Sequence, residues 1–506
     1  MTYEPPERLN LADHLLDARV REGRGGRTAL VTDRESFSYS DVQSLANRFG
    51  RLLQRAGAEP EERVLFALPD SPEFVATLFG TLKIGAVAVM ANPALSLDEV
   101  RHLLAYTRAR IVVAHAETAA AFEEAVSSAP LVKRLLVVGT DAFRRDLEAA
   151  PDALETFPSH RDDAAIWLFS GGTTGRPKAV VQTHRSFAFT TACYGGGVIG
   201  YTEDDVTLSV PKLYFGYATG ANLFFPFAAG GASALFPEPA TPDLLFEKIR
   251  KFRPTVLVNV PTMVHKMVTH EGVSAEDLAS LRVAISAGEA LPAELYERWR
   301  KTTEVELLDG LGTAEMWHIF LSNRIGSVRP GTLGTVVPGF EIRVCDEEGR
   351  PLEPGETGWL RVRGGARAIG YWQHQEKSEQ VFRGEWVVTG DLVRMDADGT
   401  VTYCGRGDEL LKVGGKWLAP AEVEGCLLDH PAVVEAAVVG APDAAGLVKP
   451  VAYVVARERR DGLAEELRAF VRDRLAPYKH PREVVFLDAL PRTHLGKVDR
   501  GRLRTG

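Results

Sequence analysis

Hydrophobic and polar residues alternate in two ways along the first three hundred residues of the chain. Short apolar runs are typical of buried strands, and apolar residues at every third or fourth position are typical of amphipathic helices. We expect strands at Ala29–Thr32, Ser36–Tyr39, Val64–Leu68, Ala86–Met90, Ile111–Ala114, Leu135–Val138, Ala164–Phe169, Val206–Val210, Ser233–Phe236, Thr255–Val260, Val283–Ser286 and Val305–Leu308. We expect helices at Leu11–Glu22, Asp41–Ala56, Ser71–Ile84, Arg101–Thr107, Glu117–Ala125, Gly220–Ala229 and Pro242–Lys251. Because strands and helices follow one another in turn, the pattern predicts parallel sheets covered by helices.

The ends of one helix carry recognisable signals. Ser40 is the expected N-cap of the helix Asp41–Ala56, because a serine hydroxyl can accept a bond from a free backbone N–H. Gly57 follows the helix and is a natural stop. The strands on either side of residues 33–35 are expected to form a hairpin.

The pattern changes from Gly331 onward. Short β-like pieces separated by turns predict a small antiparallel barrel or sheet: Phe340–Val344, Gly358–Val362, Trp386–Val388, Val393–Met395 and Thr400–Cys404. A compact last segment has helical patterns at Ala421–Leu428 and Leu463–Leu475 and strand patterns at Val433–Val439 and Val451–Val455. We expect an α/β fold with a large N-terminal domain, residues 1–407, of two helix-covered, mostly parallel sheets plus the small β-barrel. A small α+β C-terminal domain, residues 408–506, follows.

Composition narrows the class of protein. At 506 residues, with 45% hydrophobic and 25% charged residues, the chain is expected to build full-sized globular cores. A net charge of −9 argues against a nucleic-acid-binding surface. The four cysteines are widely spaced and are expected to be reduced thiols. No apolar run approaches the ~18 residues that span a bilayer, so we expect a cytoplasmic protein with no membrane or nucleic-acid partner, and a homodimer is left open.

The stretch SGGTTGRPKAVVQTHRS, residues 170–186, directly follows a predicted strand. Its first six residues are all small: Ser170, Gly171, Gly172, Thr173, Thr174 and Gly175. Backbone N–H groups and hydroxyls of such residues can surround a polyphosphate, with Lys178 to balance its charge. The spacing differs from that of a P-loop, and a loop of this composition can also be a plain turn.

Five further segments carry polar residues or glycines close to predicted strand ends or near the C-terminus. They are 287–290 (AGEA), 309–315 (DGLGTAE), 389–391 (TGD), 405–408 (GRGD) and 491–498 (PRTHLGKV). Each of the first three could be a simple turn, and a lone lysine near a C-terminus is usually a solvated charge. Together with residues 170–186, and in this order, the segments resemble the motifs of the adenylate-forming superfamily, which includes acyl-CoA synthetases, stand-alone adenylation domains and luciferases.

That resemblance implies a binding site for ATP and Mg²⁺. It places the nucleotide against the phosphate loop and against Gly288, Glu289, Ala290, Asp309, Gly310, Leu311, Gly312, Thr313, Asp391 and Arg406. It implies that Glu315 holds Mg²⁺ and that Asp391 and Arg406 contact the ribose. The chain departs from the family at Gly171, Ala179, Leu311 and Ala314. Ala314 replaces the threonine that contacts the α-phosphate, and Thr313 is the nearest replacement.

The resemblance also implies a reaction in two steps. A carboxylate attacks the α-phosphate of ATP to form an acyl adenylate, and Lys497 would bridge these two anions. A thiol, of coenzyme A or of a carrier protein, then displaces AMP. The mobile C-terminal domain would pivot at Asp408 between the two steps, bringing Gly414, Gly415 and Lys416 to the arm of coenzyme A.

Two aromatic-rich stretches, residues 211–217 and 315–323, resemble the benzoate–CoA ligase branch of this superfamily. In that branch the positions matching Phe215, Gly216, Tyr217, His318 and Ile319 belong to the acid-binding region. Gly216 stands where alanine is typical, which widens the pocket by about one methyl group. Core packing could also explain these aromatic residues, and Gly216 could be a turn residue that needs a positive φ.

Three functions therefore compete. The first is a ligase for benzoate or a substituted benzoate such as anthranilate. The second is a ligase for a bulkier, non-planar acid, or an enzyme that loads a separate carrier protein. The third, a non-catalytic nucleotide-binding protein, is disfavoured because Glu315, Asp391 and Lys497 are all present.

Overall fold

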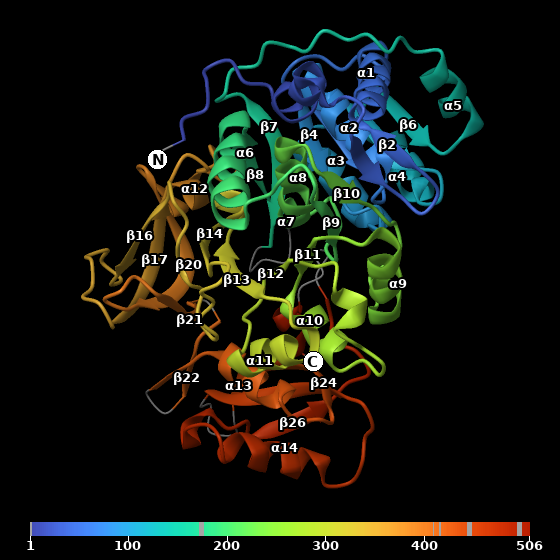
Figure 1. Ribbon diagram of the computed structural model, residues 1–506. Helices are drawn as coiled ribbons and strands as arrows, with labels where there is room; N and C mark the ends of the chain where they lie inside the picture. Colours follow the sequence, from blue (N-terminus) through green and yellow to red (C-terminus); the bar gives the residue numbers. More distant parts are fainter. Residues whose placement is uncertain are drawn as a thin grey trace.

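The structure is a computed structural model that describes residues 3–171, 177–407, 409–413, 416–442, 448–492 and 498–505. Two large sheets and their helices form the upper part of the molecule in Figure 1. A small antiparallel sheet lies at the left of this view, and the C-terminal segment lies below. The α/β fold and the smaller C-terminal part confirm the fold predicted from the pattern of the sequence.

A seven-stranded sheet contains the first half of the large part. Its order is β18-β8-β7-β4-β3-β5-β6. The strands are β3 (Arg63–Ala67), β4 (Val87–Met90), β5 (Ile111–His115), β6 (Arg134–Val138), β7 (Ala164–Ser170), β8 (Lys178–Thr183) and β18 (Gly370–Tyr371). Its helices are α1 (Tyr39–Arg55), α2 (Pro72–Lys83), α3 (Leu97–Thr107), α4 (Ala119–Ser127) and α5 (Asp141–Glu148). Five strands are parallel, whereas β8 runs antiparallel to both β7 and β18. Strand β18 comes from a much later part of the chain, and its pairing with β8 places it near the end of the phosphate loop.

A nine-stranded sheet has the order β15-β14-β13-β12-β11-β9-β10-β1-β2. Its strands are β1 (Thr28–Val31), β2 (Ser36–Ser38), β9 (Val206–Ser209), β10 (Ala232–Ala234), β11 (Val256–Asn259), β12 (Val283–Ser286), β13 (Leu307–Gly312), β14 (Ile319–Ser322) and β15 (Thr335–Val336). Helical segments along this part of the chain are α6 (His184–Thr190), η3 (Thr191–Ile199), α7 (Gly216–Thr219), η4 (Gly220–Phe224), α8 (Phe225–Ala229), α9 (Pro242–Phe252), α10 (Pro261–Val268), η5 (Glu276–Leu278), α11 (Ala293–Thr303) and η6 (Ala314–Met316). The parallel strands β11, β12 and β13 end at one edge, which is where α/β proteins bind ligands.

Two details differ from the prediction. The N-cap of α1 is Ser38, not Ser40, because Ser38 and Asp41 form a capping box in which each side chain bonds the backbone of the other. The N-terminal helix expected at Leu11–Glu22 contains two π-helical segments, η1 (Asp13–Asp17) and η2 (Val20–Arg24).

The small antiparallel sheet consists of β16 (Glu341–Cys345), β17 (Thr357–Arg363), β19 (Phe382–Arg383), β20 (Trp386–Met395) and β21 (Val401–Arg406). Helix α12 (Gln375–Val381) comes directly before β19 in the chain. Two of the short strands expected here are one continuous strand, β20, with a register shift where it pairs with β21. The long strand carries the TGD segment through the middle of the sheet.

The C-terminal part has its own small sheets and core. The pair β22 (Leu411–Val413) and β23 (Lys416–Leu418) stands beside a sheet of β24 (Val433–Pro442), β25 (Val448–Ala456) and β26 (Glu483–Phe486). Helical segments are α13 (Pro420–Leu428), α14 (Leu463–Arg472), η7 (Pro477–Lys479) and α15 (Arg500–Thr505). Buried residues from Leu411 onward pack in clusters of their own, separate from the clusters of the larger part.

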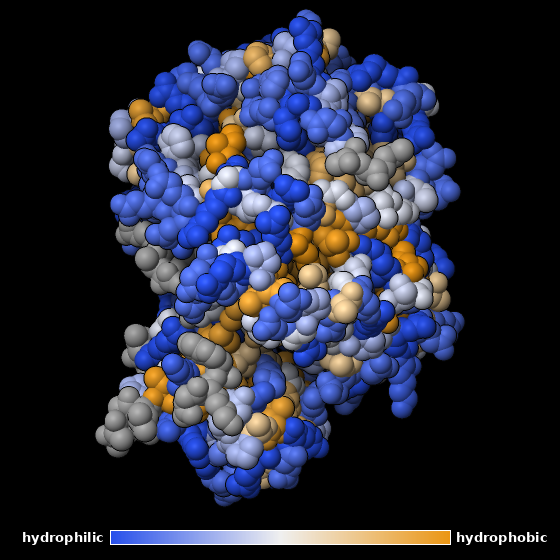
Figure 2. Space-filling model, turned by 90° about the vertical axis from the view of Figure 1, so that its left-hand side faces the viewer, coloured by the Kyte–Doolittle hydropathy of each residue, from blue (hydrophilic) through white to orange (hydrophobic). Residues whose placement is uncertain are grey.

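Polar side chains cover most of the face shown in Figure 2, and apolar side chains gather across its middle. Within the described ranges, no helix is both long and apolar enough to cross a membrane.

Candidate active site

The two ends of the phosphate loop are neighbours in the seven-stranded sheet. Ser170 is the last residue of β7 and is paired with Lys178, the first residue of β8. Gly171 is exposed. Gly172, Thr173, Thr174 and Gly175 lie outside the described residues, so their assignment to the nucleotide stays a prediction.

The structure brings the end of this loop to Glu315. The Tyr371 hydroxyl donates a hydrogen bond of 2.6 Å to Oε1 of Glu315, and Lys178 Nζ lies 5.0 Å from the centre of the Tyr371 ring. Burial and the neighbouring charge of Glu315 raise the pKa of Tyr371, so its hydroxyl keeps its proton. Sequence analysis missed Tyr371, because its pairing with Val180 across β18 and β8 has no local signal.

The strand that leads to Glu315 is closely packed. A Cβ on Gly312 would lie 2.3 Å from the His318 carbonyl oxygen, so β13 and β14 could not pair as they do with a side chain there. Gly310 faces the Leu321 carbonyl oxygen in the same way. Leu311 is half-buried and packs against the core.

Two polar groups of this segment are buried and have no hydrogen-bond partner among the described residues: Oδ1 of Asp309 and Oγ1 of Thr313. Burial raises the pKa of the Asp309 carboxyl well above its ordinary value. Buried polar atoms without partners are uncommon in folded proteins, and here they are at positions that sequence analysis assigned to the nucleotide.

The segment 287–290 follows β12 as expected. Gly288 has a φ of 92°, in the left-handed region that favours glycine. Oε2 of Glu289 accepts hydrogen bonds from the backbone N–H of Thr262 at 3.0 Å and from its hydroxyl at 2.7 Å. Glu289 therefore fixes this segment to the first turn of α10. Ala290, the last residue of the segment, lines the large cleft described below.

Asp391 and Arg406 are cross-strand partners on β20 and β21. Arg406 Nη1 lies 3.5 Å from Oδ1 of Asp391 and donates to the Thr389 carbonyl oxygen at 3.2 Å. The Asp391 carboxylate is buried, whereas the Arg406 guanidinium is partly exposed. The sheet thus brings together the two residues that were assigned to the ribose.

His318 lies in a buried aromatic cluster. Its ring is 5.2 Å from Tyr217, 5.5 Å from Tyr194 and 4.8 Å from Phe225, measured between ring centres. Nε2 lies 3.0 Å from the Tyr217 carbonyl oxygen, and because a carbonyl only accepts, Nε2 carries the proton. Burial lowers the pKa of His318 to about 3, so the ring is neutral at physiological pH. Nδ1, which then has only a lone pair, has no hydrogen-bond partner among the described residues.

Glycines give this cluster its shape. A Cβ on Gly216 would lie 3.0 Å from Cδ1 of Leu168 and 3.5 Å from Cδ1 of Trp317. A Cβ on Gly220 would lie 2.5 Å from Cδ2 of His318. Gly216 is the first residue of α7 and lies outside the left-handed region, so the alternative of a turn residue with positive φ is wrong.

The neighbours of these glycines complete the predicted acid-binding stretch. Phe215 is the N-cap residue of α7 and packs against Tyr214 at 4.5 Å between ring centres. Ile319 is buried on β14, opposite Gly312.

A buried carboxyl fixes the loop that contains residues 211–217. Oδ1 of Asp70 accepts the Leu213 N–H at 2.7 Å, and the Thr219 hydroxyl donates to the Leu213 carbonyl oxygen at 2.6 Å. Burial raises the pKa of Asp70 to about 6. Asp70 follows β3 and is distant in sequence from residues 211–217, so the sequence offered no signal for this contact.

The residues predicted to act as the hinge, to contact coenzyme A and to serve as the catalytic lysine lie mostly outside the described ranges. This holds for Asp408, Gly414, Gly415 and Lys497, whose roles stay predictions. The backbone of Lys416 begins β23 and pairs with Val413. On either side of the segment that contains Lys497, Arg492 and Val498 form an isolated antiparallel bridge.

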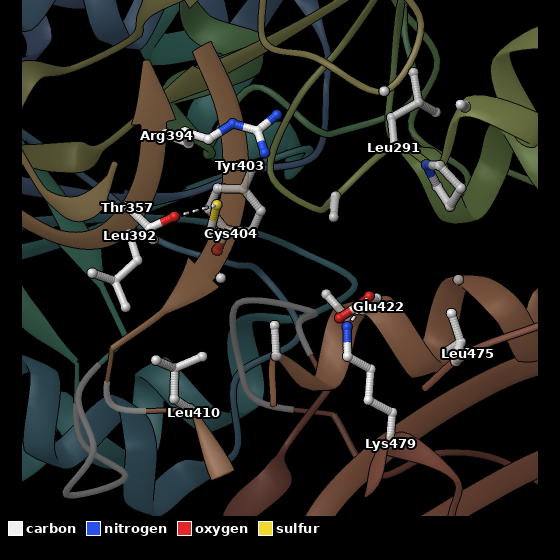
Figure 3. A pocket seen from close by; sticks show the side chains of 18 of the residues that line it. Leu291, Thr357, Leu392, Arg394, Tyr403, Cys404, Leu410, Glu422, Leu475 and Lys479 are labelled. Atoms are coloured by element: carbon white, nitrogen blue, oxygen red, sulfur yellow. Dashed lines mark hydrogen bonds and ion pairs between the residues drawn. The ribbon is translucent and has the colours of Figure 1, made fainter. Parts of the chain in front are cut away.

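A cleft of about 1920 Å³ separates the small antiparallel sheet and the start of α11 from the C-terminal part. Figure 3 shows Arg394, Tyr403 and Cys404 on one side of it and Glu422 and Lys479, which form an ion pair, on the other. The cleft lies where the two predicted domains face each other.

Comparison with known proteins gives the family. Residues 16–372 match the profile of the AMP-binding enzyme family, and residues 422–497 match that of the AMP-binding enzyme C-terminal domain. The chain is 38% identical to a benzoate–CoA ligase of Thauera aromatica, over 99% of this chain and 96% of that one. It is 32% identical to an anthranilate–CoA ligase of Pseudomonas aeruginosa, over 92% and 89% of the two chains.

Solved structures agree with this match. The crystal structure of the anthranilate CoA ligase AuaEII in complex with anthranoyl-AMP superimposes with a TM-score of 0.95 at 37% identity, over 99% of this chain and 98% of that one. A benzoate CoA ligase from Burkholderia xenovorans LB400 superimposes with a TM-score of 0.90 at 39% identity, over 98% and 100%. Since the first profile matches more than half of the residues, and both segments occur in the expected order, the chain belongs to the AMP-binding enzyme family.

Proposed function

We propose that this protein is an AMP-forming acid–CoA ligase that activates benzoate or a substituted benzoate with ATP. The acid becomes an aryl adenylate with release of pyrophosphate, and the thiol of coenzyme A then displaces AMP to give the aryl-CoA. One observation carries the proposal: Glu315 and His318 belong to the same short turn between β13 and β14. The charged group assigned to the phosphates and the neutral ring of the aromatic cluster therefore share one wall of the site.

The nucleotide half of the site rests on Lys178, Glu315, Asp391 and Arg406. Asp391 can accept hydrogen bonds from both ribose hydroxyls, and the Arg406 guanidinium lies beside it. Lys178 balances phosphate charge at the end of the loop. The pyrophosphate that leaves in the first step carries several negative charges, so this arrangement favours that step.

Mg²⁺ would be held by Glu315, where it would neutralise phosphate charge. Nowhere in the described ranges does a group of three or more histidine, cysteine or acidic side chains form a metal site. Mg²⁺ usually binds through one or two carboxylates together with substrate phosphates, so the single carboxylate of Glu315 suits this ion. Tyr371 orients the carboxylate by its hydrogen bond to Oε1.

The aromatic cluster suits a planar ring acid. Aromatic and small side chains form flat walls, and the lone pair of His318 Nδ1 can accept a hydrogen bond from an amino or hydroxyl group on the ring. A benzoate without such a substituent leaves this lone pair unsatisfied, which costs free energy. Anthranilate, which has such an amino group, is therefore at least as good a candidate as benzoate.

The C-terminal part, residues 408–506, supplies Lys497 in the first step and turns about Asp408 before the second. Separate core clusters on either side of this boundary and the large cleft between the two parts support a division here. The lysine is needed where the carboxylate meets the α-phosphate, because those two anions repel each other.

Pyrophosphate release measured across a panel of acids tests the proposal. The panel contains benzoate, anthranilate, a hydroxybenzoate, a bulky polycyclic acid and a medium-chain fatty acid, each with ATP and Mg²⁺. We expect release with the single-ring aromatic acids and aryl-CoA formation when coenzyme A is added. Release that no acid stimulates, or a preference for the polycyclic acid, would contradict the proposal. Aryl adenylate that accumulates and does not react with coenzyme A would favour a carrier protein as the acceptor.

A further inference from the structure

A single carboxylate joins the two parts of the molecule near the segment that contains Lys497. Glu435 on β24 has its Oε1 3.0 Å from Nζ of Lys266 on α10 and its Oε2 2.8 Å from Nη2 of Arg492. Lys266 belongs to the larger part and Arg492 to the C-terminal part. The Glu435 side chain is 14% exposed and the Lys266 side chain 34%, so solvent screens this pair less than a surface pair.

Arg492 lies at the base of the segment predicted to carry the catalytic lysine. It bridges to Val498, the residue directly after Lys497. The position of this base therefore depends on Arg492, and Arg492 is fixed by Glu435.

On the other side, α10 is fixed to the segment assigned to the nucleotide. Thr262 in its first turn donates two hydrogen bonds to the Glu289 carboxylate, and Lys266 lies one turn further along the same short helix. A continuous set of polar contacts thus runs from Glu289 through α10 and Glu435 to Arg492.

We propose that the Lys266–Glu435 ion pair positions the Lys497 segment for the adenylation step. Lys266 is a positioning residue in this proposal, because it acts through Glu435 and Arg492 and touches no substrate. The inference rests on the proposed function, and in particular on the role of Lys497 in the first step only. Because the pair joins the two parts in this orientation, a turn of the C-terminal part about Asp408 would break it, and the step with coenzyme A does not depend on it.

The test compares the two half-reactions in Lys266→Met, which keeps the length of the side chain and removes its charge. We expect acid-dependent pyrophosphate release to slow on the order of tenfold, the effect of about 1.4 kcal/mol, with KM for ATP little changed. Aryl-CoA formation from pre-made aryl adenylate should keep its rate. Lys266→Arg should restore pyrophosphate release to near the wild-type rate, because a guanidinium can pair with Glu435.

Lys251→Met is the matched control. Lys251 also pairs with a carboxylate, Asp33 at 2.8 Å, but both residues belong to the larger part. The control should leave both half-reactions unchanged. Unchanged pyrophosphate release in Lys266→Met, an equal loss in both half-reactions, or no recovery in Lys266→Arg would overturn the inference. A wild-type protein without acid-dependent pyrophosphate release would instead contradict the proposed function.

Discussion

Replacing Gly216 with alanine tests whether this residue borders the acid. The added Cβ would lie 3.0 and 3.2 Å from the two methyl carbons of Leu168, which is 5% exposed on β7, and 3.5 Å from Cδ1 of Trp317. Ordinary contacts between carbons are 3.5–4.0 Å, so Leu168 must shift by a few tenths of an ångström. The methyl group and the displaced Leu168 side chain then narrow the room for a ring substituent on this side of the cluster.

The magnitude follows from the size of one methyl group in a close-packed pocket. Such a group is worth about 1–3 kcal/mol in discrimination, so we expect kcat/KM for anthranilate to fall at least about tenfold relative to that for benzoate. The effect on stability should be small. Gly216 begins α7 and its φ lies outside the left-handed region, so alanine fits the backbone there. Alanine is more favourable than glycine in a helix by about 1 kcal/mol, and this gain offsets part of the cost of the tighter packing.

Steady-state pyrophosphate release with benzoate, anthranilate and one polycyclic acid, together with a thermal melt, measures both effects. An equal fall of kcat/KM for both ring acids with a lower Tm would refute a pocket role and indicate a structural one. Values that stay at those of the wild type for every acid would mean that Gly216 does not border the acid.

Three further predictions address Mg²⁺, domain movement and pH. Tyr371→Phe removes the hydroxyl that orients Glu315, so the Mg²⁺ concentration for half-maximal pyrophosphate release should rise about tenfold or more; an unchanged Mg²⁺ titration would contradict this. Asp408→Pro fixes a backbone φ and should slow aryl-CoA formation more than adenylation, and equal losses would indicate misfolding. The N–H of Leu11 donates to Nδ1 of His184, and burial lowers the pKa of His184 to about 3, so the unfolded chain binds a proton below pH ~6.5 that the folded chain excludes. Stability should therefore fall as the pH drops from 6.5 toward 3, by about 2 kcal/mol at pH 5 from this residue, and the loss of Tm between pH 7 and 5 should be smaller in His184→Gln. Equal losses of Tm in both proteins would contradict this assignment.

Sequence patterns predicted the order of strands and helices because their apolar periods are local. The capping box of α1 shows the limit of such reasoning: Ser38 and Ser40 are both plausible caps, and only the position of Asp41 three residues after Ser38 distinguishes them. The continuous strand β20 was divided in two because its polar TGD segment interrupts the apolar pattern, although Asp391 is buried beside Arg406.

The candidate site was predictable where a motif is contiguous and not where a contact joins distant residues. Asp309 and Glu315 are in one motif. Tyr371 and Asp70, by contrast, lie in or just after strands of the seven-stranded sheet, whereas their partners Glu315 and Leu213 follow strands of the nine-stranded sheet, so these contacts depend on how the two sheets pack together. The lone pair on His318 could not be foreseen either, because the tautomer depends on the Tyr217 carbonyl group on another segment.

Lys497 offers the most direct test of the two-step reaction. Wild-type protein and Lys497→Ala are each mixed with ATP, Mg²⁺ and anthranilate without coenzyme A, and aryl adenylate is measured by mass spectrometry after rapid quenching. In a second experiment each protein receives pre-made aryl adenylate and coenzyme A. We predict that the wild type performs both steps, whereas Lys497→Ala forms no detectable adenylate and still produces aryl-CoA at near the wild-type rate. Adenylate formation by Lys497→Ala at the wild-type rate, or no adenylate from the wild type with any aromatic acid, would contradict the account.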